Sequence, residues 1–266
     1  MSKKSNANLF KIFAYSGTVI ATVLSALATV FSYDKTANYF TTNSILFPIA
    51  IVFAILAFAA SIAAALLIPK EEITSSSPFG SNLLVALPAA IGFGIGAIFS
   101  VLEFAKSNST LFLIATVLLA LSMAHVLLCE TERKSSFLGF FPPVACALLI
   151  AVLYFDTSLE MNAPMKVTVQ CALLPLMLYF TAELRYLLNR EIPRLYFALA
   201  LISIVLASLC VLAVPAACLM GTLQNTNCLA AALVAVGANI TVLLKLRRYL
   251  QPIPSPENDT KETDAQ

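Results

Sequence analysis

Residues 45–68 read ILFPIAIVFAILAFAASIAAALLI, a run with no charged side chain and a single serine. An α-helix rises 1.5 Å per residue, so about 20 apolar residues cross the roughly 30 Å hydrocarbon core of a bilayer. A helix is also the open-chain structure that satisfies its own backbone hydrogen bonds in lipid. The stretch therefore predicts a membrane-spanning helix.

Other parts of the chain repeat this length and apolar character. The further segments are 11–32, 82–104, 110–129, 137–156, 163–187, 194–218 and 226–249. Together with 45–68 they predict an all-α, polytopic membrane helical bundle of eight transmembrane helices, arranged as four hairpins within residues 11–250. Residues 1–10 are expected to form a cytoplasmic N-terminal segment. Residues 251–266 are rich in proline and acids, which predicts a disordered cytoplasmic tail.

The composition of the whole chain agrees with a membrane location. Of its 266 residues, 60% are hydrophobic and 11% are charged, and the mean hydropathy is +0.90. Soluble domains carry about 25% charged residues, so the composition excludes a cytosolic enzyme, a disordered protein and a secreted disulfide scaffold. The net charge of +2 is too small to favour nucleic acid as a partner. The lipid bilayer is the expected environment.

The distribution of basic residues predicts the orientation. Twelve lie before the first predicted span or near the ends of the second, fourth, sixth and eighth: Lys3, Lys4, Lys11, Lys70, Arg133, Lys134, Arg185, Arg190, Arg194, Lys245, Arg247 and Arg248. The other ends carry Lys35, Lys106 and Lys166. Cytoplasmic loops are enriched in Lys and Arg, so both termini are expected in the cytoplasm. The expected location is a cell membrane, specifically the bacterial cytoplasmic membrane.

A competing interpretation concerns the first span. Lys3 and Lys4 precede an apolar run that contains Ala26-Leu27-Ala28, which has the form of a signal-peptidase site. Cleavage there would leave seven spans and place the new N-terminus outside. The run is longer than a usual signal-peptide core, so we favour a retained span.

Glu183 and Arg185 are the first candidates for a functional site, because they lie inside the sixth predicted span. A charged residue at the centre of a spanning helix costs about 2.5–3.5 kcal/mol even on the lenient insertion scale. The two residues face different sides of the helix, so each needs a partner elsewhere. One interpretation is a coupling or binding site that faces the bundle interior. The favoured one is a clamp between helices at the inner interface.

His125, the only histidine, lies about one turn from the end of the fourth predicted span, and Cys129 shares its face. A tetrahedral metal site needs three or four ligands, and the sequence brings no others to this pair. We therefore expect no metal ion and no other cofactor. A proton relay through His125 is an alternative, but a packed, hydrogen-bonded histidine is the favoured interpretation.

Glu103 and Asp156 lie at span ends that the charge pattern places outside the cytoplasm. Each is at the C-terminal end of its helix, where the helix dipole disfavours an acid. One hypothesis is an acidic vestibule that gathers cations. The favoured alternative is a set of interfacial ion pairs, in which Lys106 lies three residues after Glu103 and Lys166 opens the span after Asp156.

Uncharged polar and small residues within the spans complete the candidate set. Gln170 and Asn239 are expected to form hydrogen bonds between helices. Gly92 and Gly96 form a GxxxG pattern, which allows a neighbouring helix to approach closely.

The sequence contains no recognisable catalytic motif, so we expect a non-enzymatic membrane protein that acts in assembly, sensing or partner binding. A homo-oligomer or a partner membrane subunit is expected in that case, docked on an exposed small-residue face such as the Gly92/Gly96 side. The alternative is a small-molecule or ion transporter. It predicts that Glu183 and at least two of three other residues face one cavity: Gln170, His125 and Asn239.

Overall fold

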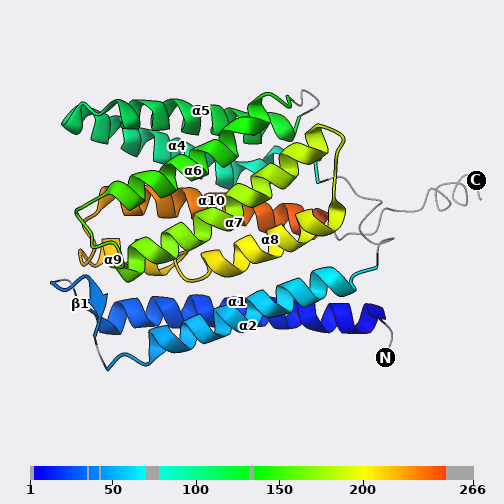
Figure 1. Cartoon of the computed structure of the whole chain (residues 1–266), viewed down its shortest axis with the longest axis horizontal. Helices are drawn as coiled ribbons and strands as arrows, with labels where there is room; N and C mark the ends of the chain where they lie inside the picture. The colour runs from blue at the N-terminus through cyan, green and yellow to red at the C-terminus, as the bar shows by residue number, and fades with distance from the viewer. Residues whose placement is uncertain (1–2, 35, 42, 70–77, 132–134, 250–266) are drawn as a thin grey trace, which may run out of the picture.

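The computed structural model describes residues 3–34, 36–41, 43–69, 78–131 and 135–249. It is 79% helical, and its described part contains nine α-helices. Seven of these helices are long and apolar enough to cross a membrane. The predicted class of an all-α, multi-pass membrane protein is therefore consistent with the structure (Figure 1). The predicted tail, 251–266, lies outside the described residues.

The helices follow one another with short connections. Their bounds are α1 Lys3–Ser32, α2 Leu46–Leu67, α4 Leu83–Ser107, α5 Thr110–Cys129, α6 Phe141–Phe155, α7 Pro164–Leu187, α8 Pro193–Ala207, α9 Ala213–Leu219 and α10 Thr226–Tyr249. A 3₁₀ turn, Leu138–Phe140, precedes α6. Because α1 begins at Lys3, the predicted segment 1–10 is helical over most of its length.

The predicted span 194–218 is not one continuous helix. It is divided into α8, of 15 residues, and α9, of seven, with a turn over 208–212. Pro215 explains part of the break, because proline cannot donate the hydrogen bond of a helix interior and is tolerated in a first turn, where α9 places it. At 1.5 Å per residue α8 is about 22 Å long, too short to span alone. Figure 1 shows α8 and α9 together running from one end of the bundle to the other.

An unpredicted two-stranded hairpin joins α1 to α2. Strand β1, Tyr33–Asp34, pairs antiparallel with β2, Tyr39–Phe40. The Asp34 carboxylate accepts hydrogen bonds from the backbone N–H and the hydroxyl of Thr36, at 2.8 and 2.6 Å. These bonds hold the turn and keep the pKa of Asp34 below its usual range. The hairpin lies at the end of the bundle opposite to the start of α1 and the end of α10 (Figure 1).

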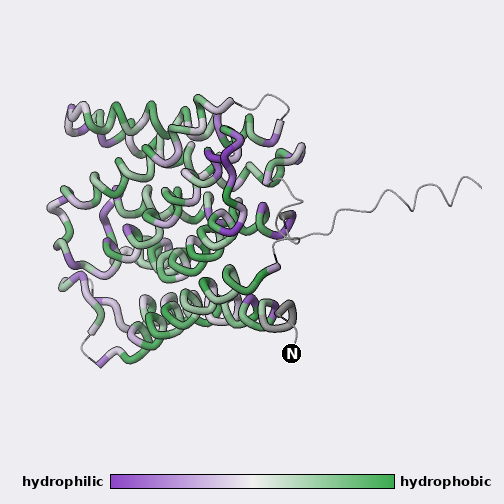
Figure 2. The backbone as a smooth tube through the Cα atoms, turned by 45° about the vertical axis from the view of Figure 1, so that its right-hand side comes forward, coloured by the Kyte–Doolittle hydropathy of each residue, from purple (hydrophilic) through white to green (hydrophobic). Residues whose placement is uncertain are grey.

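The helices α1 and α2 form a pair at one edge of the bundle, packed against α8 and α9 (Figure 1). The buried side of α1 carries an alanine at every seventh position: Ala7, Ala14, Ala21 and Ala28. The other helices surround α7 and α10, which are the most buried of the spanning helices. Figure 2 shows apolar residues along all the helices, with hydrophilic residues concentrated at their ends and in the loops.

The expectation of an exposed Gly92/Gly96 face is wrong, because both glycines are buried against α10 of the same chain. A Cβ atom on Gly92 would lie 2.9 Å from the carbonyl oxygen of Leu233, and one on Gly96 would overlap Val234. The GxxxG pattern therefore allows α4 and α10 of the same chain to approach closely. The hairpin arrangement predicted from sequence did not include this contact.

The first residues of α1 and the last of α10 lie at the same end of the bundle (Figure 1). We call this the basic end, because the last turn of α10 carries Arg247 and Arg248 and the last turn of α7 carries Arg185.

Candidate functional site

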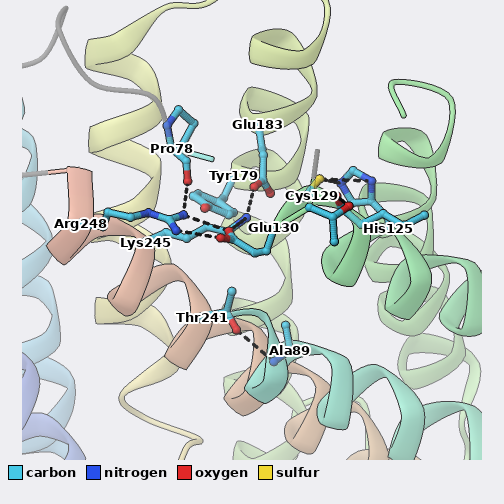
Figure 3. Close-up of polar contacts among 12 residues, drawn as sticks. Pro78, Ala89, His125, Cys129, Glu130, Tyr179, Glu183, Thr241, Lys245 and Arg248 are labelled. Carbon is cyan, nitrogen blue, oxygen red and sulfur yellow. Dashed lines mark hydrogen bonds and ion pairs between the residues drawn. The ribbon is translucent and has the colours of Figure 1, made fainter. Parts of the chain in front are cut away.

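A group of buried charges lies near the basic end, where α5, α7 and α10 meet (Figure 3). Glu183 of α7 is 1% exposed and forms an ion pair with Lys245 of α10, which is 2% exposed. The Lys245 ammonium also lies 3.8 Å from a carboxylate oxygen of Glu130, the buried residue that caps the end of α5. One lysine is thus shared between two acids on two different helices.

Arg248 completes the group with a bidentate ion pair to Glu130. Its two terminal nitrogens donate to the two carboxylate oxygens, at 2.7 and 2.9 Å, in the fork geometry that strengthens Arg–carboxylate pairs. We call Glu130, Glu183, Lys245 and Arg248 the ion cluster. Its two acids and two bases sum to zero formal charge, so burying the four together leaves no net charge in the interior.

Residues 78–80 contact the ion cluster. Arg248 donates a further hydrogen bond to the carbonyl oxygen of Pro78, at 2.6 Å. The ammonium of Lys245 lies 5.6 Å from the ring centroid of Phe79, within the range of a cation–π contact. A Cβ atom on Gly80 would overlap the guanidinium of Arg248. The ion cluster therefore fixes the position of residues 78–80 as well as three helices.

Helical periodicity explains how the sequence places these groups. On α10, Thr241, Lys245 and Arg248 are four and three residues apart, so they share one face. At the start of this face, the hydroxyl oxygen of Thr241 accepts a hydrogen bond of 3.0 Å from the backbone N–H of Ala89. That N–H follows Pro88, which interrupts the backbone hydrogen bonds of α4. The same polar face of α10 therefore binds the backbone of α4 through Thr241 and, about one turn further along, contributes Lys245 and Arg248 to the ion cluster (Figure 3).

Two tyrosines and the histidine lie beside the ion cluster. The hydroxyls of Tyr179 and Tyr196, both buried, form a hydrogen bond of 2.7 Å between α7 and α8. His125 is buried, and its Nε2 lies 3.3 Å from the Cys129 sulfur. Within the described residues no three His, Cys, Asp or Glu side chains are arranged to hold a metal ion.

The structure therefore gives Glu183 a partner that sequence reasoning did not identify. In the sequence, Lys245 serves only as a marker of orientation, and Glu130 is not among the candidate residues. The charge pattern gave a weak signal: Lys245, like Glu183, lies about one turn inside a predicted span. Arg185 faces away from the ion cluster, as its spacing from Glu183 predicted, and its Nε donates to the carbonyl oxygen of Arg190 at 3.1 Å.

The other intramembrane candidates do not join this site. Gln170 precedes Glu183 by 13 positions on α7, which corresponds to about 20 Å along the helix axis. Asn239 donates to the carbonyl oxygen of Ala235 in its own helix, at 2.8 Å, so this bond does not link helices as expected. Glu183 and His125 are thus brought together, whereas Gln170 and Asn239 are not. A transport path predicts that Glu183 and at least two of the other three residues face one cavity, and the four residues are not arranged in this way.

Glu103, at the end opposite to the basic end, forms the ion pair that its spacing predicted. It accepts from Lys106 at 2.8 Å, and the same oxygen accepts from the hydroxyl of Thr226 at 2.8 Å. The hydrogen bond from Thr226 links the end of α4 to the start of α10. Lys106 is 65% exposed, and a solvent-exposed ion pair contributes about 0–1 kcal/mol to stability.

Asp156 differs from the expected ion pair. Its carboxylate accepts from the amides of Asn225 and Asn227, at 2.9 and 2.8 Å, and from the backbone N–H of Ser158. Lys166 is buried but donates to the backbone carbonyl oxygen of Asp156, at 2.8 Å, instead of to its carboxylate. Partial burial raises the pKa of Asp156, and the hydrogen bonds from Asn227, Asn225 and Ser158 outweigh it, so the pKa lies below its usual value.

Comparison of the chain with protein families, with curated proteins and with solved structures finds no match. A function is therefore inferred from the geometry of the molecule itself. Two features of that geometry stand out: the ion cluster at the basic end, and an apolar groove between α1 and α2 of about 660 Å³.

Proposed function

We propose that the chain is a non-enzymatic integral membrane protein with a role in assembly, sensing or partner binding. In this proposal α8 and α9 together form one crossing, so that the chain crosses the bilayer eight times. The basic end lies in the cytoplasm of a bacterial cell, because positive charge accumulates on that side of membrane proteins. Of the three roles, assembly with a second copy or with a partner membrane subunit is the one we test.

The observation that carries the proposal is the mutual neutralisation of the ion cluster. Each of its four charges has an opposite charge within 4.0 Å, and three of the four side chains are at most 2% exposed. A coupling residue of a transporter has to exchange its proton or ion with water during the cycle, and intramembrane acids that do so face a path for the ion. Glu183 instead joins α7 to α10, which supports the clamp.

The proposal is tested first against transport. The full chain and its Glu183→Gln variant are reconstituted into liposomes that enclose a pH-sensitive dye, and the decay of an imposed pH gradient is recorded. Glu103→Gln, at the opposite end, serves as the matched control. We expect the same decay for all three proteins as for protein-free liposomes. A proton flux that the Glu183 variant alone abolishes, with its gel-filtration profile unchanged, would overturn the clamp in favour of transport.

The assembly role is tested in native membranes. Membranes that contain the tagged full chain are treated with a short amine-reactive cross-linker, solubilised mildly and separated on native gels. We expect a species larger than one chain with its detergent, in which mass spectrometry identifies a second copy or a constant partner subunit. Migration as a monomer before and after cross-linking would refute assembly.

A further inference from the structure

The helices α1 and α2 enclose an apolar groove of about 660 Å³. Its lining is apolar apart from Ser16, and it combines small residues with bulky ones. Gly17, Ala57 and Ala60 are small and buried, and Phe13 and Leu56 are large and mostly exposed. A hollow with small side chains at its base and large ones at its edges has the shape to receive a narrow apolar chain.

The groove exists because the two helices approach closely along one line and separate beside it. A Cβ atom on Gly17 would lie 3.0 Å from the Cβ of Ala57, so the backbones are near contact there. Toward the opposite end of the bundle, Ala21, Ala50 and Ala54 pack around Leu209 in a small core of their own. Phe53 packs against this small core and also lines the groove, so it marks where the groove ends on α2.

The length of the groove matches one leaflet. Its lining runs from Phe10 to Ile20 on α1 and from Phe53 to Ala63 on α2, which is about 15 Å at 1.5 Å per residue. The hydrocarbon core of a bilayer is about 30 Å thick, so the groove covers about half of it. Most of the lining lies in the half nearest the basic end, where α1 begins and α2 ends (Figure 1), and on α2 it continues about three residues past the middle of the helix.

We propose that the groove binds one acyl chain of a phospholipid from the leaflet at the basic end. A transmembrane helix of a partner would pack along the whole hydrocarbon thickness, whereas this hollow ends near the midplane. An acyl chain of one leaflet has the matching depth and fills an apolar hollow through dispersion contacts with its walls. The inference rests on the membrane location in the proposed function but not on the assembly role.

The charge at the groove's end fits the same ligand. Lys11 follows Phe10, the lining residue nearest the start of α1. Its ammonium lies 5.6 Å from the ring centroid of Phe197 and 3.5 Å from the Asn8 side-chain oxygen. The positive charge that Lys11 brings to this end of the groove is complementary to a lipid phosphate. A lipid whose chain lies in the groove would place its headgroup at this level.

The test is photocross-linking of lipid to the full chain. The protein is reconstituted in phosphatidylglycerol and phosphatidylethanolamine vesicles with a trace of phospholipid that carries a diazirine near the end of one acyl chain. After irradiation, adducts are mapped by mass spectrometry. We expect residues 10–20 and 53–63 to carry at least about threefold more adducts per exposed residue than the lipid-facing side of α5.

Two variants decide whether the groove is responsible. Ala59→Phe fills the groove from an exposed position in its lining, and Ala120→Phe makes the same change at an exposed position of α5. We expect the excess of adducts to disappear in Ala59→Phe and to persist in Ala120→Phe, with the melting temperatures of both close to that of the wild type.

Three results would overturn the inference. Adducts spread evenly over all lipid-facing helices would show annular lipid only. In the amine-reactive cross-linking experiment described above, a protein–protein cross-link at Lys11 would show that a second copy or a partner helix occupies the groove. Absence of adducts from every helix would refute the membrane location itself, so failure of the groove and failure of the proposed function are distinguishable.

Discussion

Removing one charge of the ion cluster should cost far more than removing two opposite charges together. Glu183→Met leaves two bases facing one acid, and Lys245→Met leaves two acids facing one base. Breaking a buried ion pair by deleting one partner costs about 3–5 kcal/mol. Lys245 keeps Glu130 at 3.8 Å when Glu183 is lost, so we expect about 3 kcal/mol for the acid variant. Among the described residues Lys245 is the one cation that forms an ion pair with Glu183, so we expect about 4 kcal/mol when Lys245 is lost.

The double variant Glu183→Met/Lys245→Met restores neutrality, because Glu130 and Arg248 still pair through two hydrogen bonds. Replacing a buried ion pair with apolar side chains of similar volume is often neutral or stabilising. We therefore expect the double variant to lie within about 1 kcal/mol of the wild type. Its cost would then be smaller than the sum of the single costs by about 6 kcal/mol, a factor of the order of 10⁴ in the unfolding equilibrium constant.

Unfolding is measured in mixed micelles by titration with a denaturing detergent, followed by the reactivity of cysteine thiols. Cys146, Cys210 and Cys228 are buried and free, so they become reactive only when the bundle opens. Lys106→Met at the exposed pair is the matched control, and its expected cost is below about 1 kcal/mol. If the double variant costs as much as the two single variants added together, the ion cluster is not the neutral unit described here.

Three further predictions test other parts of the structure. Gly92→Ala should destabilise the chain by about 1–3 kcal/mol, because the added Cβ would lie 2.9 Å from a backbone oxygen of α10. Gly94→Ala should be nearly neutral, because its Cβ would meet only the sulfur of a flexible methionine. Titration with a denaturing detergent compares the stabilities of the two variants. Asp156 has a lowered pKa in the folded chain, so the stability it supplies is present above the ordinary carboxyl pKa and is lost as the pH falls through the lowered one. Acid-induced loss of melting temperature should therefore be smaller in Asp156→Asn. Reporter fusions after Lys35 and after Arg133 should register opposite compartments, and a common compartment for both would refute the proposed orientation.

The positions of the long apolar helices could be predicted from sequence because lipid imposes a length and an apolar composition on each segment. Segment 45–68, for example, became α2 with a shift of one residue at each end. The break between α8 and α9 was harder to predict. Pro215 was visible in the sequence, but whether a proline bends a helix or ends it depends on the neighbours that satisfy the freed backbone groups. Those neighbours are set by the tertiary fold.

Partners in the interior were the least predictable part. Glu183 stood out because an acid within a span is costly, whereas Lys245 lay among basic residues already explained by orientation. Periodicity gives the face of a helix on which a residue lies but not the helix that this face meets. For the same reason Gly92 and Gly96 predicted a close helix contact correctly, while the identity of the contacting helix, α10 of the same chain, required the structure.

The location of the ion cluster follows from a limit that lipid places on helix packing. Lipid tails are as apolar as the side chains they surround, so apolar burial alone selects only weakly which helix faces meet. Charges select strongly, because a buried charge without its partner is costly. Near the bilayer centre, however, each charge would also raise the cost of insertion. Glu183 and Lys245 lie about one turn from their helix ends, where this insertion cost is lower. The two charges can therefore fix the register of α7 against α10 at little expense to insertion.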